Sequence, residues 1–322
     1  MSGKRKKKSK KNNPVSDYIT YLGVRMICSV LFMLGIDRSM RLACGLGRLM
    51  WYHYHRGRGR ALENLKNSFP DKDEQWIEET GKKSFQHLVM LVVDIIFTTR
   101  LVRKDNWKEF ASYVNTERCK WMMAEGKGMI LLTPHYGNFE IIGYLLGLFG
   151  FDIYSIARPI DNPYINKWLY SVREKHGQRI IDKKGASAVM PSLLKKGAVL
   201  GFIADQDAGR KGVFVDFFGR KASTYKSIGL LAITENLPIG IGVCRQEYGK
   251  FFFEIECGKI ITPDQWQDKD NPLKWVTQEF TSEMERLIRK DPSQYWWLHR
   301  RWKHRPKEER NKAKKMNLSY DK

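Results

Sequence analysis

A histidine and a glutamate five residues apart are the side chains of this sequence best suited to catalysis. His135 follows a short apolar run at residues 129–132, which is typical of a buried strand, and Glu140 lies in the first turn of an expected helix. Histidine titrates closest to neutral pH, so His135 could take a proton from a substrate hydroxyl. Glu140 could hold the imidazole in one tautomer. The same spacing also fits a strand-ending histidine and a carboxylate favoured by the helix dipole.

The elements around these two residues place them at the edge of a sheet. Thr133 and Pro134 end the strand, Asn138 can cap the following helix, and Gly150 ends that helix. His135 therefore follows the carboxyl end of a strand, where open α/β sheets bind their ligands. No serine or cysteine stands next to His135, so we expect the nucleophile to be a hydroxyl of the substrate.

Strand and helix patterns alternate through the rest of the chain. Short apolar runs predict strands at 129–132, 152–157, 178–181, 198–204, 238–245 and 251–256. Amphipathic patterns predict helices at 61–69, 73–99, 117–125, 163–175, 186–196, 226–236 and 271–290, and the glycines of residues 56–60 predict a basic turn. This alternation predicts an α/β fold in which a mixed β-sheet is flanked by helices.

Further polar residues follow other predicted strands. Arg158 stands before a proline at a strand end, where its guanidinium could bind a phosphate or form a surface salt bridge. Asp205 and Gln206 also follow a strand, and they could pair with a cation, bind sugar hydroxyls, or only form a turn. Arg210 and Lys211 lie between two glycines, a composition suited to a lipid phosphate, although the P-loop pattern is absent.

The chain is strongly basic, with a net charge of +22 over 322 residues. Residues 4–11 hold seven basic residues and no acid, and residues 300–315 hold nine basic residues and two acids. Such tails suit an anionic membrane surface, where each basic residue contributes about 1 kcal/mol. Nucleic acid is the competing partner, but no zinc-finger spacing or RNP-like motif supports it. The five cysteines have no CxxC spacing, which favours reduced thiols, and no residues have metal-ligand spacing.

An apolar segment near the N-terminus predicts contact with a membrane. Residues 18–35 are mostly apolar but include Arg25, which makes a spanning helix marginal and favours a helix that lies in the interface. A buried core helix is the alternative. Residues 40–54 extend the apolar surface, and no signal-peptide cleavage site follows. We therefore divide the chain into a disordered basic tail (1–14), a membrane-anchoring helical segment (15–55), an α/β domain (56–305) and a basic C-terminal tail (306–322).

Several segments together resemble one enzyme family. The His135-x4-Glu140 spacing is similar to the motif of the glycerolipid acyltransferase superfamily. The segments 157–163, 172–177, 205–209 and 297–303, which read ARPIDNP, VREKHG, DQDAG and WLHRRWK, resemble the bacterial lipid A late acyltransferases in the same order. The resemblance runs from about residue 18 to about residue 305, and the set is specific although no single motif is. These enzymes add a secondary acyl chain to a lipid A precursor.

The resemblance implies roles for four residues in catalysis. His135 would be the general base and Glu140 the group that orients it. Arg173, in the predicted helix 163–175, would stabilise the developing oxyanion or bind a substrate phosphate. Asp205 would be a functional acid that pairs with a cation or binds sugar hydroxyls.

The resemblance also implies the substrates and the location. The donor would be acyl-acyl carrier protein or acyl-CoA, the acceptor a lipid A precursor, and no cofactor or metal would be required. We expect the catalytic domain at the cytoplasmic face of the inner membrane. The residues expected to contact substrate are Asn138, Arg158, Gln206, Arg210 and Lys211.

Two other hypotheses stay open at this point. The first is a related acyltransferase that acts on a lysophospholipid, an ornithine lipid or a mannosylated glycolipid. The second is a non-catalytic protein that keeps the fold and binds membranes or nucleic acid. The intact His135 and Glu140 argue against the second hypothesis.

Overall fold

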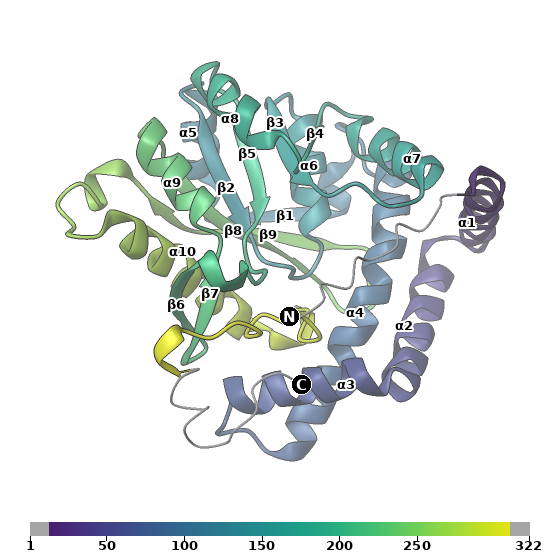
Figure 1. Ribbon diagram of the computed structural model, residues 1–322. Helices are drawn as coiled ribbons and strands as arrows, with labels where there is room; N and C mark the ends of the chain where they lie inside the picture. Colours follow the sequence, from purple (N-terminus) through teal and green to yellow (C-terminus); the bar gives the residue numbers. More distant parts are fainter. Residues whose placement is uncertain (1–12, 310–322) are drawn as a thin grey trace.

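A seven-stranded sheet forms the centre of the molecule. The computed structural model describes residues 13–309, and helices pack on both sides of the sheet (Figure 1). Its strands are β1 (Ala111–Val114), β2 (Met129–Thr133), β3 (Ile153–Ala157), β4 (Arg179–Asp182), β5 (Val199–Ile203), β8 (Ile239–Gln246) and β9 (Phe253–Ile261). The order is β1-β9-β8-β2-β5-β3-β4. Only the β8–β9 pair is antiparallel, and all the other neighbours are parallel, so the sheet is mixed.

The helices divide between the two faces of this sheet. They are α1 (Pro14–Leu34), α2 (Ile36–His53), α3 (His55–Ser68), α4 (Glu74–Leu101), α5 (Glu117–Ala124), α6 (Phe139–Leu148), α7 (Pro163–Glu174), α8 (Ala186–Lys195), α9 (Lys226–Glu235) and α10 (Pro272–Lys290). One face packs against α5 and α6, through Met129 and Leu146 among others. The opposite face packs against α8, α9 and α10, because Ile130 and Leu200 point the other way.

The alternation of elements and the mixed sheet are confirmed by the structure. The predicted strand at 129–132 is β2, one residue longer, and the predicted helix at 163–175 is α7, one residue shorter. Local pattern was sufficient for β2, which is mostly buried, and for α7, whose start is marked by the cap at Asn162. The expected tail at 1–14 and the end of the tail at 306–322 lie largely outside the described residues.

Other details differ from the expectations. The predicted basic turn at 56–60 was wrong, since these residues belong to α3, where Gly57 lets the helix pack closely against the ring of Tyr54. The short strand β1 and the hairpin of β6 (Val213–Phe217) and β7 (Arg220–Thr224) were missed. The hairpin depends on a distant contact, because Phe217 stacks on Trp302 with ring centroids 5.6 Å apart. Local pattern does not contain such a contact.

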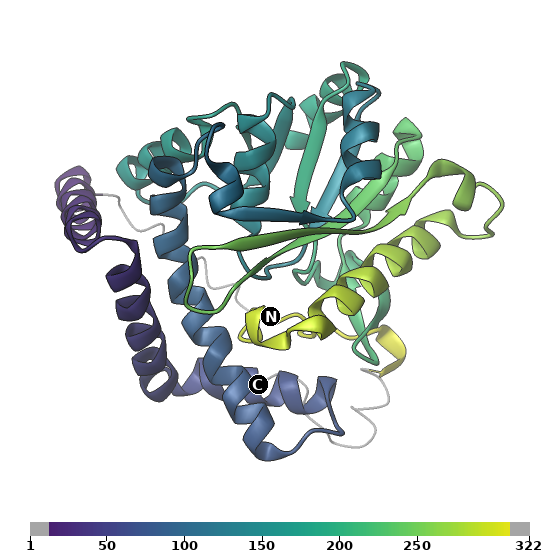
Figure 2. The same cartoon turned by 180° about the vertical axis from the view of Figure 1, so that it is seen from behind.

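The N-terminal helices stand at the side of the molecule. Figure 2 shows α1 and α2 outside the layer of helices that covers the sheet, with α2 against α4. Within residues 13–309, two helices are long and apolar enough to cross a membrane, α1 and α4, but α4 is mostly buried whereas α1 is mostly exposed. Val15, Met26 and Met33 of α1 are each at least 67% exposed. An apolar helix this exposed favours association with a membrane.

Candidate active site

The turn between β2 and α6 carries His135 and is held by three backbone hydrogen bonds. The N–H of Gly137 donates to the Gln294 carbonyl at 3.1 Å, and the N–H of Asn138 donates to the Cys244 carbonyl at 3.1 Å. Gly137 has a φ of 51°, and a Cβ there would lie 1.9 Å from the Cys244 carbonyl oxygen, so only glycine fits. The His135 carbonyl in turn accepts from the Trp296 N–H at 3.2 Å. The backbone around His135 is therefore held rigidly at the carboxyl end of β2.

Asp205 is the acid that contacts His135. Its Oδ1 lies 2.7 Å from Nδ1 of His135, and its Oδ2 accepts from the His135 backbone N–H at 2.9 Å. The register of the parallel strands β2 and β5 pairs Thr133 with Ile203, so both side chains stand just beyond neighbouring strand ends. Asp205 is fully buried and His135 is 6% exposed. Burial alone would raise the pKa of Asp205, but the charge and hydrogen bonds of His135 hold it well below its ordinary value.

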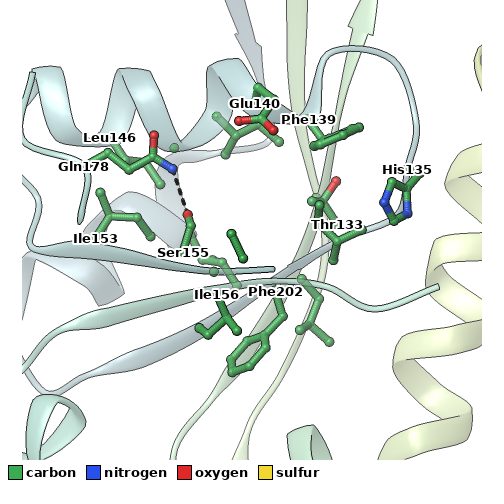
Figure 3. A pocket seen from close by; sticks show the side chains of 18 of the residues that line it. Thr133, His135, Phe139, Glu140, Leu146, Ile153, Ser155, Ile156, Gln178 and Phe202 are labelled. Atoms are coloured by element: carbon green, nitrogen blue, oxygen red, sulfur yellow. Dashed lines mark hydrogen bonds between the residues drawn. The ribbon is translucent and has the colours of Figure 1, made fainter. Parts of the chain in front are cut away.

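Glu140 does not orient His135, which corrects the sequence-based prediction. Glu140 instead binds Arg173 in a bidentate pair, with Nε donating to Oε2 at 2.8 Å and Nη2 donating to Oε1. The reason is the helix start: Asn138 caps α6 through a bond from the Ile141 N–H at 3.1 Å, and the first turn then aims Glu140 toward α7. Figure 3 shows Glu140 and His135 well separated on the two sides of Phe139.

Aromatic rings enclose the imidazole of His135. The ring centroids of Trp296, His299 and Phe139 lie 4.7, 4.6 and 5.2 Å from that of His135. His299 is held through its carbonyl, which accepts from the Asn64 side chain at 3.1 Å. Burial, followed by the neighbouring His135, lowers the pKa of His299 to about 4, so this second histidine is neutral at neutral pH. Trp296 and His299 lie near the C-terminal end of the chain, and nothing in the sequence signals that they contact His135.

A large, mostly apolar cavity of about 910 Å³ opens beside His135 (Figure 3). Its wall includes Glu140, Arg173 and Trp296 next to the histidine. The rest of the wall is largely hydrocarbon and comes mainly from helices α4, α5, α6, α8 and α9 and from strands β2, β3, β5, β8 and β9. Because Nδ1 of His135 faces Asp205, Nε2 is the ring nitrogen left for a ligand in this cavity. The arrangement can accept a proton from a group that enters beside a long apolar chain.

The other predicted substrate-binding residues divide into two groups. Arg158 and Gln206 line the cavity, and Arg158 is largely exposed at the rim, 4.0 Å from Asp161. Asn138 is 1% exposed and serves as the α6 cap, and it does not line the cavity. Arg210 and Lys211 lie exposed in a short 3-10 turn and do not line the cavity either.

One group of side chains in residues 13–309 has the composition of a metal site. It consists of His135, Asp205 and His299, whose possible ligand atoms lie within 4.8 Å of one another. However, both oxygens of Asp205 already accept hydrogen bonds from His135. The residues therefore fit a hydrogen-bonded acid–histidine pair better than a set of free metal ligands.

Residues 297–303, the C-terminal aromatic and basic segment, pack against the loop that follows Asp205. Arg301 is 1% exposed, and its guanidinium donates to the Gln206 carbonyl at 3.2 Å and to the Thr224 hydroxyl at 2.6 Å. Trp297 is 1% exposed. Arg301 therefore holds the loop after Asp205 in place, and both side chains are packed in the interior.

Comparison with known proteins decides the family. Residues 5–304 match the bacterial lipid A biosynthesis acyltransferases. The chain belongs to this family. It is 27% identical over 301 residues to a lipid A biosynthesis lauroyltransferase of Escherichia coli (strain K12), which covers 90% of this chain and 92% of that enzyme.

Other relatives carry different names within the same family. A lipid A biosynthesis acyltransferase of Haemophilus influenzae is 26% identical over 262 residues, covering 80% of this chain and 79% of the relative. A lipid A biosynthesis palmitoleoyltransferase of Escherichia coli (strain K12) is 25% identical over 257 residues, covering 76% and 78%. This lipid A biosynthesis acyltransferase family member is thus an acyltransferase, and its relatives are named for different acyl chains.

Proposed function

We propose that this protein moves a fatty acyl chain from an acyl thioester to a hydroxyl of a lipid A precursor, with His135 as the general base. The observation that carries the proposal is the buried His135–Asp205 pair beside a large apolar cavity. A proton acceptor in this position suits a reaction in which a lipid hydroxyl meets an acyl chain. The family of the chain supports both the acyl transfer and the lipid acceptor.

The two ring nitrogens of His135 have different roles in the proton transfer. Asp205 accepts the Nδ1–H of His135, which leaves the Nε2 lone pair to take the proton of the acceptor hydroxyl. The acceptor oxygen then forms a bond to the thioester carbonyl carbon. When the tetrahedral intermediate collapses, the carbon–sulfur bond breaks and His135 returns the proton to the thiolate. Asp205 stays ionised throughout, because its pKa lies well below the ordinary value.

Arg173 supplies positive charge for the negatively charged intermediate. Glu140 holds two nitrogens of its guanidinium, and both side chains line the cavity at partial burial. A bidentate pair fixes the plane of the guanidinium, so the remaining N–H groups point in a defined direction. We assign Arg173 to the oxyanion or to a substrate phosphate, and Glu140 to the positioning of Arg173.

The charge of the protein supports a carrier-bound donor and a membrane location. We propose acyl-acyl carrier protein as the donor, because an acidic carrier is attracted by a chain of net charge +22. We propose a location at the cytoplasmic face of the inner membrane, which the exposed apolar helix α1 and the basic residues 4–11 support, since basic segments stay in the cytoplasm.

The direct test is a transfer assay with the detergent-solubilised protein. Acyl-acyl carrier protein and a tetra-acylated lipid A precursor are incubated with the enzyme, and the lipid product is weighed by mass spectrometry. We expect a gain of one acyl chain that His135→Ala abolishes. Tyr248→Phe, a conservative change at an exposed side chain away from the cavity, is the control.

Two results would change the proposal. Undiminished transfer by His135→Ala would overturn the role of His135. Loss of the thioester that depends on His135, with no gain in lipid mass, would keep the acyl chemistry and reject this acceptor in favour of another lipid.

A further inference from the structure

The cavity beside His135 reaches both faces of the central sheet. Neighbouring residues of a strand point to opposite faces, and both Ser155 and Ile156 of β3 line the cavity. Gly201 and Phe202 of β5 repeat this arrangement. In Figure 3, Ser155 lies on the upper side of the strands, whereas Ile156 and Phe202 lie on the lower side. The cavity therefore has two arms, one on each face.

The α6-side arm crosses the sheet under α6. Two small residues, Ser155 of β3 and Gly201 of β5, leave room on this face, and the register aligns them in one row with Leu131 of β2 and Gly240 of β8. This row spans about 14 Å at about 4.8 Å per strand. The lining of the cavity also includes Cys119 on α5, so the length of this arm suits a linear hydrocarbon chain.

The α8-side arm lies between the sheet and the helices α8 and α9. Its wall is formed by Ile156, Phe202, Ala186, Met190 and Ile228, all apolar. The strands of the sheet separate the α8-side arm from the α6-side arm. A reaction that joins two lipids needs room for two chains, and the α8-side arm provides the second place.

The charged groups near the two arms differ. Glu140 and Arg173 belong to α6 and α7 and flank the α6-side arm, so a thioester whose chain enters that arm places its carbonyl near the guanidinium. Lys183 stands at the start of the α8-side arm, 3.2 Å from the Tyr225 hydroxyl, and Arg158 is exposed at the rim. Two cations at the entrance suit the phosphate of an anionic lipid.

We propose that the α8-side arm binds a hydrocarbon chain of the lipid acceptor, while the α6-side arm binds the acyl chain of the donor. Lys183 and Arg158 bind the anionic headgroup that remains outside the arm. The two chains then reach His135 from opposite faces of the sheet, which brings the acceptor hydroxyl and the donor carbonyl together at one strand edge. This inference rests on the function proposed above, because it assigns the acceptor of that reaction.

The test separates acceptor binding from chemistry. In a His135→Ala background, binding of the tetra-acylated lipid A precursor is measured by native mass spectrometry in detergent. Ala186→Phe, which fills the α8-side arm, is expected to weaken this binding tenfold or more, and Lys183→Gln by about threefold to tenfold. Gly201→Val is the matched control, because it fills the other arm. The three atoms nearest to a Cβ at Gly201 are the Ser155 Oγ at 3.3 Å and two atoms beyond 3.5 Å.

Transfer kinetics in the otherwise wild-type protein give the second readout. Ala186→Phe is expected to raise the KM for the lipid acceptor and to leave the KM for acyl-acyl carrier protein within twofold. Gly201→Val is expected to do the reverse and to shift the preferred donor toward shorter acyl chains. An acceptor analogue with a four-carbon hydroxyacyl chain should bind wild type and Ala186→Phe equally, because the shortened chain no longer needs the filled arm.

Each alternative result has a distinct meaning. Unchanged acceptor binding in both Ala186→Phe and Lys183→Gln overturns the inference, even if the wild-type protein transfers acyl chains normally. A shift in donor chain preference by Ala186→Phe also overturns it, because the arms would then be exchanged. If Ala186→Phe does not fold, Met190→Trp replaces it and carries the same expectations. A wild-type protein that binds the lipid through this arm but transfers nothing would overturn the proposed function instead.

Discussion

Two acid–base pairs lie beside the cavity, and they differ in burial. His135 and Asp205 are both almost fully buried, whereas the side chains of Glu140 and Arg173 are 16% and 18% exposed. The first pair is fixed by strand ends and a rigid turn, and the second by two helices of which α7 has no fully buried residue. The buried pair is shielded from water, whereas the second pair lines the cavity, where its guanidinium can meet a charged group of the substrate. We therefore assign proton transfer to the first pair and binding of charge to the second.

The largest expected effect tests whether Asp205, rather than Glu140, is the acid that supports His135. Asp205→Asn keeps the shape of the side chain but offers an amide to Nδ1, so we expect kcat to fall about 10³-fold or more, as the loss of a triad acid does. The circular dichroism and the lipid binding of this variant should remain close to those of wild type. A fall in kcat of less than tenfold would remove Asp205 from the mechanism.

In the second pair, we expect substitution of Glu140 to lower kcat less than substitution of Arg173. Arg173→Ala should lower kcat about 10²- to 10³-fold, because a fixed cation near the oxyanion is lost. Glu140→Gln should lower it only about 10- to 100-fold, since the amide can still hold the guanidinium through one bond. If Glu140→Gln costs as much as Asp205→Asn, the division between the two pairs is wrong.

The smallest expected effect is on the pH dependence of stability, and it comes from the partly buried His299 beside the first pair. The unfolded chain protonates His299 near pH 6.5, but the folded protein does so only at about pH 4. Between these values the unfolded state binds more protons, so the free energy of unfolding falls as the pH drops. His299→Gln should reduce this loss between pH 7 and pH 5 by about 1–2 kcal/mol. Urea unfolding of both proteins at the two pH values measures it, and an identical loss would contradict the neutral state of His299.

The sequence was sufficient for most of the elements, although not for β1 or the β6–β7 hairpin, and for part of the site. Apolar runs located β2 and β5, so His135 and Asp205 were both expected at strand ends. Periodicity does not give strand order, however, and only the adjacency of β2 and β5 brings these side chains to 2.7 Å. The short sequence distance between His135 and Glu140 suggested the wrong partner, because the cap at Asn138 turns the first helical residues away from the histidine.

The cavity and its aromatic wall were beyond prediction for a related reason. Trp296 and His299 reach His135 from the far end of the chain, and their place depends on backbone contacts of residues 294–299 with the β2–α6 turn and with Asn64. The α6-side arm depends on strand register, which brings Gly201 beside Leu131. Neither register nor such long-range contacts leave a local pattern in the sequence.

The central claim is that Asp205, and not Glu140, holds the Nδ1 proton of His135. Proton NMR of the histidine-labelled protein tests this directly, since an imidazole proton in a short bond to a carboxylate resonates far downfield. We predict one such resonance that is absent in His135→Ala, unchanged in Glu140→Gln and lost or moved upfield in Asp205→Asn. A resonance that survives Asp205→Asn and disappears in Glu140→Gln would contradict the account.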